Sequence, residues 1–368
     1  MTDPEQVTYR TVGVDYDLLD AGKREALAAA LSTSAFARER GAVAEDASRG
    51  ESAFVMRWQG QQLALVLECL GTKSTLASLY QQETGVDRFE WIGVDTVAAV
   101  VNDLCSVGAL PLVVNAYFAT GSDAWYAAPG RFASLVRGWR AGCEQAGAVW
   151  GGGESPMLRG IVAEGEIDLA GCAVGYVPAD RPPLLGDRLR PGDEIVLVAS
   201  SGLHTNGASL ARRAAEVAGG LAVRLPDGTT LGDALLTPSL LYVKLLAALY
   251  DADAPLSYLA HITGHGLRKL MRANQTLTYR VTDLPPVPPV LAFVVDTLRL
   301  PAHEAYGTFN MGAGFAVFCP AGTGQRVVEV ATAAGYRALV AGRVEDGPRQ
   351  VVLEPVGVTF QGEELQLR

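Results

Sequence analysis

The chain of 368 residues lacks any apolar segment of membrane-spanning length that is free of charge, Pro, Gly and Asn, although 49% of its residues are hydrophobic. It also lacks the pattern of a secretory signal, because Met1–Glu5 carry acidic residues where basic ones are typical and no apolar stretch follows them. We therefore expect a cytoplasmic protein with no membrane partner.

Cysteine and basic residues are scarce as well. The five cysteines are odd in number and include no C-x-x-C pair, which argues against a disulfide framework and a zinc ribbon. The 30 Lys and Arg residues are outnumbered by 40 Asp and Glu, so the net charge is -10 and we expect no nucleic-acid partner. Small phosphorylated ligands remain compatible with this charge, since backbone N–H groups, a few cations and a metal ion supply local positive potential.

The length of the chain predicts two domains of ordinary size. Residues 17–40 have the pattern of an amphipathic helix and small polar residues follow, which predicts an N-terminal helix and flexible extension over residues 1–50. The Pro- and Gly-rich residues 177–186 have the composition of a domain junction. We therefore predict one domain over residues 51–178 and a second over residues 187–368.

Strands and helices alternate in both predicted domains, which indicates a mixed α/β fold, and no fixed-period repeat is present. The first domain is predicted to contain strands 52–58 and 63–69, joined in a hairpin with Gly60 in its turn, then helix 95–107, strand 112–118, helix 131–146 and strand 167–176. The second is predicted to contain strands 194–199, 256–262 and 314–318, helices 205–218, 240–250, 267–272, 290–298 and 325–335, and a terminal hairpin.

The first motif with potential chemistry places Glu68 at a strand end before Gly-Thr-Lys, with further acidic residues on the next predicted helix. Asp95 and Asn102 are seven residues apart and share a helix face. Asp103 directly follows Asn102, so its side chain projects beside that face. A few carboxylates at a strand end suit Mg²⁺. On spacing alone, an N-cap and a solvated helix position explain Asp95 and Asp103 equally well, and Lys73 could be a surface charge.

A second motif is the glycine run Gly151–Gly153, which follows a presumed strand and precedes Glu154. Glycines allow the backbone to approach a ligand closely, and Glu154 could bind a metal ion or a hydroxyl group. A tight turn with a solvated glutamate is the alternative.

A third motif, Ser200–Gly207, joins a buried-looking strand to an amphipathic helix. A loop in this position presents free N–H groups at a helix N-terminus, which is a common anion site in α/β proteins. It is not a Walker A loop, because G-x-x-x-x-G-K-[ST] is absent. His204 could bind phosphate or transfer a proton, or it could cap or pack the loop.

Two further segments, Ala260–Gly266 and Tyr306–Gly314, are rich in His, Thr, Asn and Gly. His261 and His265 have the i,i+4 spacing of a zinc helix, but glycines on both sides of His265 disfavour the helix that this spacing requires. Asn310 precedes Gly-x-Gly, where a tight turn could meet a ligand or serve only as a turn.

Taken in order, these motifs resemble the aminoimidazole ribonucleotide synthetases, the phosphoribosylformylglycinamidine cyclo-ligase family. The likeness extends from about Tyr9 to Arg343. The segments that carry it are Gly13–Asp15, Ile92–Asp95, Val101–Leu104, Tyr117–Gly121, Gly152–Glu154, Ser201–Gly207, Thr237–Pro238, Tyr242–Lys244, Ala260–Gly266 and Thr308–Gly312.

The resemblance implies a two-domain α/β fold in which residues 51–178 bind ATP and metal and pair through their sheet in a homodimer. It also implies a reaction of de novo purine biosynthesis, in which ATP phosphorylates the formyl oxygen of formylglycinamidine ribonucleotide and the amidine nitrogen then displaces phosphate to close the imidazole ring. The expected ligands are ATP, Mg²⁺ and a phosphoribosyl small molecule.

The motifs and the resemblance together predict three groups of site residues. The candidate catalytic residues are Lys73, His204 and Asn206. The candidate ATP- and phosphate-binding residues are Gly71, Thr72, Lys73, Asp95, Asn102, Gly152, Gly153, Ser201, Gly202, Gly207, Thr263 and Asn310. The candidate metal ligands are Glu68, Asp95, Asp103 and Glu154.

Three segments depart from the family's pattern, all in the N-terminal half. Family members typically have Asp-Gly-Val-Gly-Thr-Lys, whereas this chain has Glu68–Lys73, with an acidic residue one methylene longer. The usual preceding Gly-rich segment is replaced by Ala53–Trp58, and Gly-Glu-Thr-Ala-Glu-Met-Pro is represented by Gly153–Met157, with a single acidic residue. The alternative is a divergent paralogue, either an ATP-dependent kinase or synthetase for another small molecule or an inactive nucleotide-binding protein.

Overall fold

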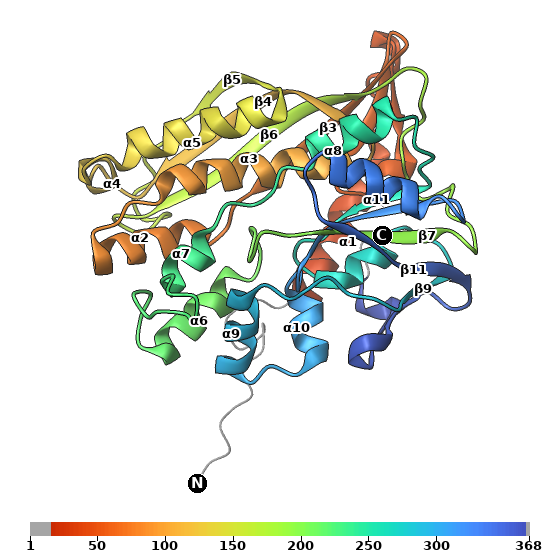
Figure 1. Ribbon diagram of the computed structural model, residues 1–368. Coiled ribbons are helices and arrows are strands. Elements are labelled where there is room, and N and C mark those ends of the chain that lie inside the picture. Colours follow the sequence, from red (N-terminus) through yellow and green to blue (C-terminus); the bar gives the residue numbers. More distant parts are fainter. Residues whose placement is uncertain (1–15, 366–368) are drawn as a thin grey trace.

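Two β-sheets, one from each half of the chain, organise the structure, a computed structural model that describes residues 16–365 (Figure 1). The matched segment Gly13–Asp15 lies outside the described residues. The N-terminal sheet has six strands in the order β1-β2-β3-β6-β4-β5. Their bounds are β1 Ala42–Glu45, β2 Phe54–Trp58, β3 Gln61–Cys69, β4 Leu110–Thr120, β5 Val149–Glu154 and β6 Ile167–Val177. Neighbouring strands are antiparallel except β4 and β5, which are parallel.

Helices cover one face of this sheet. The helices of the N-terminal half are α1 Tyr16–Ser32, α2 Lys73–Thr84, α3 Phe89–Ser106, α4 Ala124–Ala127 and α5 Arg131–Ala146, with 3₁₀ turns η1 Arg38–Arg40 and η2 Asp46–Ser48. Helices α3 and α5 run side by side along the strands (Figure 1). On β6, buried Leu169 and Ala173 alternate with exposed Asp168 and Cys172, and on β3 Leu67 is 73% exposed. The face opposite α3 and α5 is therefore open to solvent over these strands.

Glycines allow α3 and α5 to pack at short distance. A Cβ atom on Gly138 would overlap the carbonyl oxygen of Glu90, one on Gly93 would lie 2.5 Å from the backbone of α5, and one on Gly142 would lie 2.8 Å from the side chain of Val97. Glycine weakens a helix interior by about 1 kcal/mol relative to alanine. Here the close packing of the two helices requires it.

The C-terminal sheet has seven strands in the order β13-β12-β9-β11-β7-β10-β8. Their bounds are β7 Glu194–Ala199, β8 Tyr258–His261, β9 Leu277–Val281, β10 Ala313–Cys319, β11 Ala338–Asp346, β12 Gln350–Leu353 and β13 Val358–Gln361. The helices are α6 Ala208–Ala218, α7 Leu231–Leu236, α8 Val243–Asp251, α9 Pro289–Leu298, α10 Ala302–Thr308 and α11 Gly324–Ala333, with 3₁₀ turns η3 Gly266–Met271, η4 Glu354–Val356 and η5 Gly362–Glu364. The central strands β7 and β10 are almost wholly apolar and buried, so the core of this half lies around them.

Much of the predicted element pattern is confirmed. Residues 131–146 and 194–199 form α5 and β7 residue for residue, and the predicted hairpin turns at Gly60, which has a φ of 79°. The mixed α/β architecture is also present in both halves. None of the described helices combines the length and the apolar character needed to cross a membrane.

Several boundaries differ from the prediction for local reasons. Helix α3 begins at Phe89 rather than residue 95, because the Asp87 carboxylate accepts a hydrogen bond from the Phe89 backbone N–H at 2.8 Å. Helix α6 begins at Ala208 rather than residue 205, because Gly207 has a φ of 86° and cannot continue a helix. Residues 42–45, predicted within a flexible extension, join the sheet as β1.

Candidate active site

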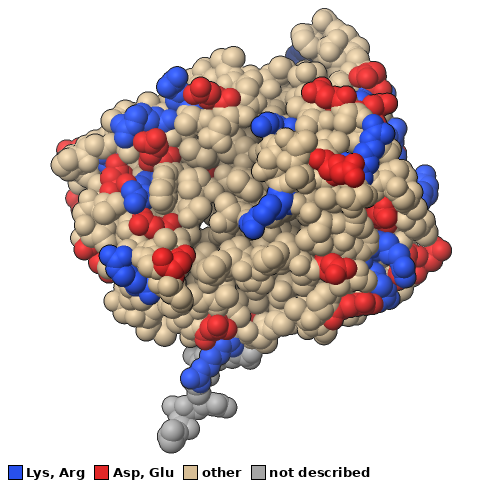
Figure 2. Space-filling model, viewed as in Figure 1, with Lys and Arg blue, Asp and Glu red and all other residues tan. Residues whose placement is uncertain are grey.

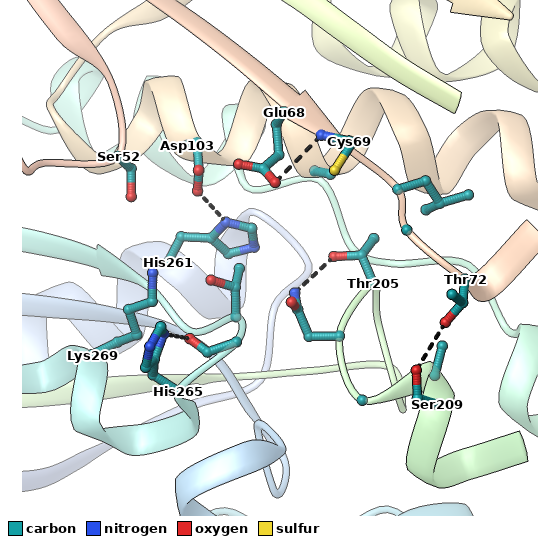
Figure 3. Close-up of a pocket in the computed structure, with 18 of the residues that line it drawn as sticks. Ser52, Glu68, Cys69, Thr72, Asp103, Thr205, Ser209, His261, His265 and Lys269 are labelled. Atoms are coloured by element: carbon teal, nitrogen blue, oxygen red, sulfur yellow. Dashed lines mark hydrogen bonds and ion pairs between the residues drawn. The ribbon is translucent and has the colours of Figure 1, made fainter. Parts of the chain in front are cut away.

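A pocket of about 560 Å³ lies where the two halves of the chain meet (Figure 3). The N-terminal half contributes the end of β3 with the loop into α2, residues 68–72, and Asp103 on α3. The C-terminal half contributes residues 205–209, which lead into α6, and residues of the segment between β8 and η3. On the molecular face that Figure 2 shows, acidic and basic residues are interspersed.

At one end of the pocket the N-termini of α2 and α6 converge. Thr72 is the N-cap residue of α2, and its Oγ1 lies 3.3 Å from the Oγ of Ser209 in the first turn of α6. A Cβ atom at Gly207 would overlap the ring of Phe309, so only glycine fits the approach to α6. Backbone N–H groups without helical partners and two hydroxyl groups therefore face one space, which is suitable for a phosphorylated ligand.

The other end of the pocket is charged. The Nδ1 atom of His261 lies 2.7 Å from Oδ1 of Asp103, and both side chains are almost fully buried. Burial raises the pKa of Asp103, but the hydrogen bond and the charge of His261 outweigh it, and the pKa lies below its ordinary value. The carboxylate therefore orients the imidazole ring, which leaves the second ring nitrogen for other partners.

Two other charged groups at this end have pKa values shifted towards each other. Burial, followed by the nearby charge of Asp103, raises the pKa of Glu68 to about 7. Burial, followed by the charge of Arg272, lowers the pKa of Lys269 to about 7. Shifts of this kind at groups lining a cleft are typical of functional sites.

The predicted metal set is not assembled as expected. Within residues 16–365 no cluster of three or more His, Cys, Asp or Glu side chains could hold a metal ion by itself. Glu68 and Asp103 line the pocket, but Asp95 is buried against Lys73 and Glu154 is exposed on β5, outside the pocket. Asp95 and Glu154 therefore do not lie in the pocket with Glu68 and Asp103.

Asp95 and Asn102 do share a face of α3, but that face packs against the C-terminal half. Oδ1 of Asp95 accepts hydrogen bonds from the backbone N–H and the hydroxyl of Ser239 at 2.8 and 2.5 Å. Asn102 donates to the Leu240 carbonyl at 2.8 Å and accepts from the Tyr242 N–H at 2.7 Å. These side chains hold residues 239–242 in position and do not line the pocket.

His204 and its loop are internal supports as well. His204 is buried, burial lowers its pKa well below the ordinary value, and its Nε2 accepts a hydrogen bond from the Ser201 N–H at 3.1 Å. Asn310 accepts from Ser200 Oγ at 2.8 Å and donates to the Gly202 carbonyl at 2.8 Å. The loop is thus fixed from within, and its first half does not reach the pocket.

The structure therefore divides the predicted site residues into two sets. Those that line the pocket are Glu68, Gly71, Thr72, Asp103, Asn206, Gly207 and Thr263. Those that do not line it are Lys73, Asp95, Asn102, Gly152, Gly153, Glu154, Ser201, Gly202, His204 and Asn310. The sequence interpretation missed Ser209, His261 as a partner of Asp103, and Lys269. The i,i+4 spacing of His261 and His265 was considered only as a zinc site, and Lys269 on η3 belongs to no recognised sequence motif.

Comparison with protein families gives two matches that together span most of the chain. Residues 50–177 match the AIR synthase related protein N-terminal domain, and residues 190–354 match the corresponding C-terminal domain. A phosphoribosylformylglycinamidine cyclo-ligase of Methanobrevibacter smithii is 31% identical over 363 residues, which cover 98% of this chain and 99% of the relative. The enzyme of that name from Sorangium cellulosum is 41% identical over 286 residues, covering 75% of this chain and 78% of the relative.

Solved structures share the fold at lower identity. A protein of Thermus thermophilus is 24% identical with a TM-score of 0.56, covering 84% of this chain and 90% of its own. The thiamine-monophosphate kinase of Stenotrophomonas maltophilia is 19% identical with a TM-score of 0.59, covering 83% and 90%. The hydrogenase maturation protein HypE is 19% identical with a TM-score of 0.59, covering 83% of this chain and 91% of its own.

Proposed function

The chain belongs to the AIR synthase related protein family, and from this we propose that it catalyses the ATP-dependent cyclisation of formylglycinamidine ribonucleotide to aminoimidazole ribonucleotide, with release of ADP and phosphate. The proposal is supported by the cyclo-ligase names of its relatives, one of which matches 98% of this chain. The family resemblance and the two-domain α/β fold expected from the motifs are confirmed by the same matches. The reaction makes the protein a ligase of purine biosynthesis. The cytoplasm is the place expected for such an enzyme.

The observation that carries the proposal is the pocket that joins an anion-binding end to a charged end. We assign the triphosphate of ATP to the end where Thr72 and Ser209 face each other at the N-termini of α2 and α6. Preorganised N–H donors stabilise charge that develops on a transferring phosphoryl group. The formyl oxygen of the second substrate would lie between this end and the Asp103–His261 pair.

Mg²⁺ is the cofactor expected with ATP, and the pocket fits it. Protein-bound Mg²⁺ commonly uses one or two carboxylates together with substrate phosphates and water, so a larger protein cluster is not required. Glu68 and the second oxygen of Asp103 are hard oxygen donors in the same pocket and would hold the ion. When bound, it would neutralise phosphoryl charge.

We assign the proton transfer of ring closure to His261. The amidine nitrogen attacks the phosphorylated formyl carbon, the bond from that carbon to the phosphorylated oxygen breaks, and phosphate leaves with the electron pair. The attacking nitrogen loses a proton, which the second ring nitrogen of His261 accepts while Asp103 holds the ring. Asn206 remains a candidate substrate contact, and Lys73 and His204 act as positioning residues. Holding the open chain in a cyclising conformation supplies the entropic part of the rate.

The proposal includes a homodimer formed through the N-terminal sheet. Leu67 on β3, Leu112 on β4 and Val149 on β5 are among the exposed large apolar residues. Large apolar side chains exposed on the strands of one sheet are a feature that an interface would cover. A second copy of the sheet, which carries the same surface, is the occupant that fits it.

The test is a direct assay of the full chain with ATP, Mg²⁺ and formylglycinamidine ribonucleotide. We expect aminoimidazole ribonucleotide and ADP in equal amounts. ATP binding without any aminoimidazole ribonucleotide would reject the cyclo-ligase and favour the divergent paralogue. The same assay with other small phosphate acceptors would then separate an enzyme acting on another substrate from an inactive protein.

A further inference from the structure

Lys269 is a buried cation, and its ammonium has no direct contact partner among the described side chains that line the pocket. It extends from η3 into the charged end of the pocket and is 8% exposed. Among the side chains that the structure describes, which are those of residues 22 and 25–365, none makes a hydrogen bond with its ammonium or an ion pair within 4.0 Å. Figure 3 places it across the pocket from Thr72 and Ser209, which we assign to ATP.

Two of the three acidic residues whose charges act on Lys269, Asp103 and Glu51, have closer partners; the third is Glu68. Asp103 accepts the hydrogen bond of His261 at 2.7 Å. Glu51 accepts the hydroxyl of Tyr258 at 2.7 Å, and the same oxygen lies 3.8 Å from Arg272. Their charges favour the ammonium at longer range, but none of these carboxylates makes direct contact with it.

An ammonium group buried without a contact partner destabilises a folded protein, because the charge has lost water and gained little in return. Burial is accordingly the largest influence on Lys269, and it lowers the pKa of the side chain. An anionic group of a ligand would supply the missing contact. Local instability of this kind is commonly retained where a site must bind something.

The same turn supplies a second cation. Arg272 follows Lys269 by three residues, and side chains three apart in a 3₁₀ turn project on the same side. We propose that Lys269, assisted by Arg272, binds the phosphate monoester of the second substrate, at the end of the pocket opposite the ATP triphosphate. The inference rests on the proposed function, which gives the second substrate a ribose phosphate.

The experiment measures binding of ribose 5-phosphate and, separately, of Mg·ATP to the full chain by titration calorimetry. Four proteins are compared: the wild type, Lys269→Met, Lys269→Arg and Lys244→Met, whose lysine is exposed on α8. We expect Lys269→Met to weaken ribose 5-phosphate binding roughly 10- to 100-fold, as for loss of one charge-assisted hydrogen bond, and to leave Mg·ATP affinity within about threefold. Lys269→Arg should retain most of the affinity, and Lys244→Met all of it.

Several outcomes would overturn the subsite. These are no detectable binding of ribose 5-phosphate to the wild type at millimolar concentration, unchanged binding to Lys269→Met, or an equal loss of Mg·ATP affinity. Lys269→Met should also melt no lower than the wild type, and a lower melting temperature with unchanged ribose 5-phosphate binding would make Lys269 a structural residue.

The cyclisation assay separates this inference from the proposed function. A wild type that makes no aminoimidazole ribonucleotide, yet binds ribose 5-phosphate through Lys269, would reject the reaction and keep the subsite. A Lys269→Met variant that cyclises the substrate with an unchanged KM would reject the subsite and keep the reaction.

Discussion

Lys73 and Asp95 form an ion pair with 2.7 Å between Nζ and Oδ2, and both side chains are completely buried. The pair joins α2 to α3 and also reaches the C-terminal half, because Lys73 donates to the Thr237 carbonyl at 3.3 Å and Asp95 accepts from Ser239. Two motif residues that the sequence suggested for ligand binding therefore hold the two halves of the chain together.

Lys73→Met should destabilise the protein strongly, because it leaves the Asp95 carboxylate buried without its cation. Breaking a buried pair in this way typically lowers the free energy of unfolding by about 3–5 kcal/mol. The midpoint of urea unfolding measures the effect. Adding Asp95→Asn to Lys73→Met should recover part of the lost stability. If Lys73→Met alone unfolds at the wild-type urea midpoint, the buried ion pair does not stabilise the fold as expected.

Glu68→Gln should stabilise the free protein in a pH-dependent way. The pKa of Glu68 is raised to about 7 from an ordinary value of 4.5, so between these values the unfolded chain has released a proton that the folded chain keeps. The wild type therefore loses stability as pH rises through this window, and the variant does not. The difference in melting temperature should be small at pH 4.5, grow up to about pH 7 and remain constant above it.

The same variant tests the metal assignment. Glu68→Gln should weaken Mg·ATP binding in calorimetry while ATP binding without Mg²⁺ changes little. Equal Mg·ATP affinities of variant and wild type would remove Glu68 from the metal site.

His261→Gln should lower kcat by about 10²- to 10⁴-fold, the usual contribution of a positioned general base, with Mg·ATP affinity nearly unchanged. Steady-state kinetics and calorimetry measure the two quantities. His303→Gln is the matched control, because His303 lies on α10 with a half-exposed side chain. A kcat of His261→Gln close to that of the control would rule out the assigned proton transfer.

Ser209→Asp should reduce ATP affinity by tenfold or more, because it introduces a carboxylate where the triphosphate is expected. The same carboxylate in the first turn of α6 interacts favourably with the helix dipole, by about 0.3–1 kcal/mol, so the fold should not suffer. ATP titration and thermal melting of one sample distinguish the two effects. Undiminished ATP binding would move the triphosphate elsewhere.

If the protein forms the dimer proposed above, Leu67→Asp should convert it to a monomer in sedimentation analysis, because the Leu67 side chain is 73% exposed in the centre of the open sheet face. Val217→Asp provides the control, since Val217 is 53% exposed on α6, away from that face. A variant that sediments as the wild type does would exclude this face as the interface.

The sequence predicted the elements whose signals are local. A continuous apolar run rich in β-branched residues predicts β7, and a long amphipathic pattern predicts α5. Helix α2 was missed, because its residues 73–84 are largely polar and small and show little periodicity. Helix boundaries depended on single side chains such as Asp87, which a periodic pattern does not register.

The site was predicted only in part, for a reason that is not local. Asp95 and Asn102 were correctly assigned to one helix face, but the sequence does not say whether a ligand or another segment covers that face. Asp103, one position round, is the residue that reaches the pocket. Lys269 belongs to no motif, and its importance comes from burial, which only the packed structure contains.

The packing of α3 on α5 has a consequence for any survey of sequence variants. Replacing helical glycines by alanine is a general route to stabilisation, but Gly93, Gly138 and Gly142 have no room for a methyl group. In a library that covers every substitution, these three positions should tolerate no residue other than glycine, because they lie where α3 and α5 contact each other. A designer who starts from this scaffold should keep them fixed and seek stabilising changes on the solvent side of the same helices.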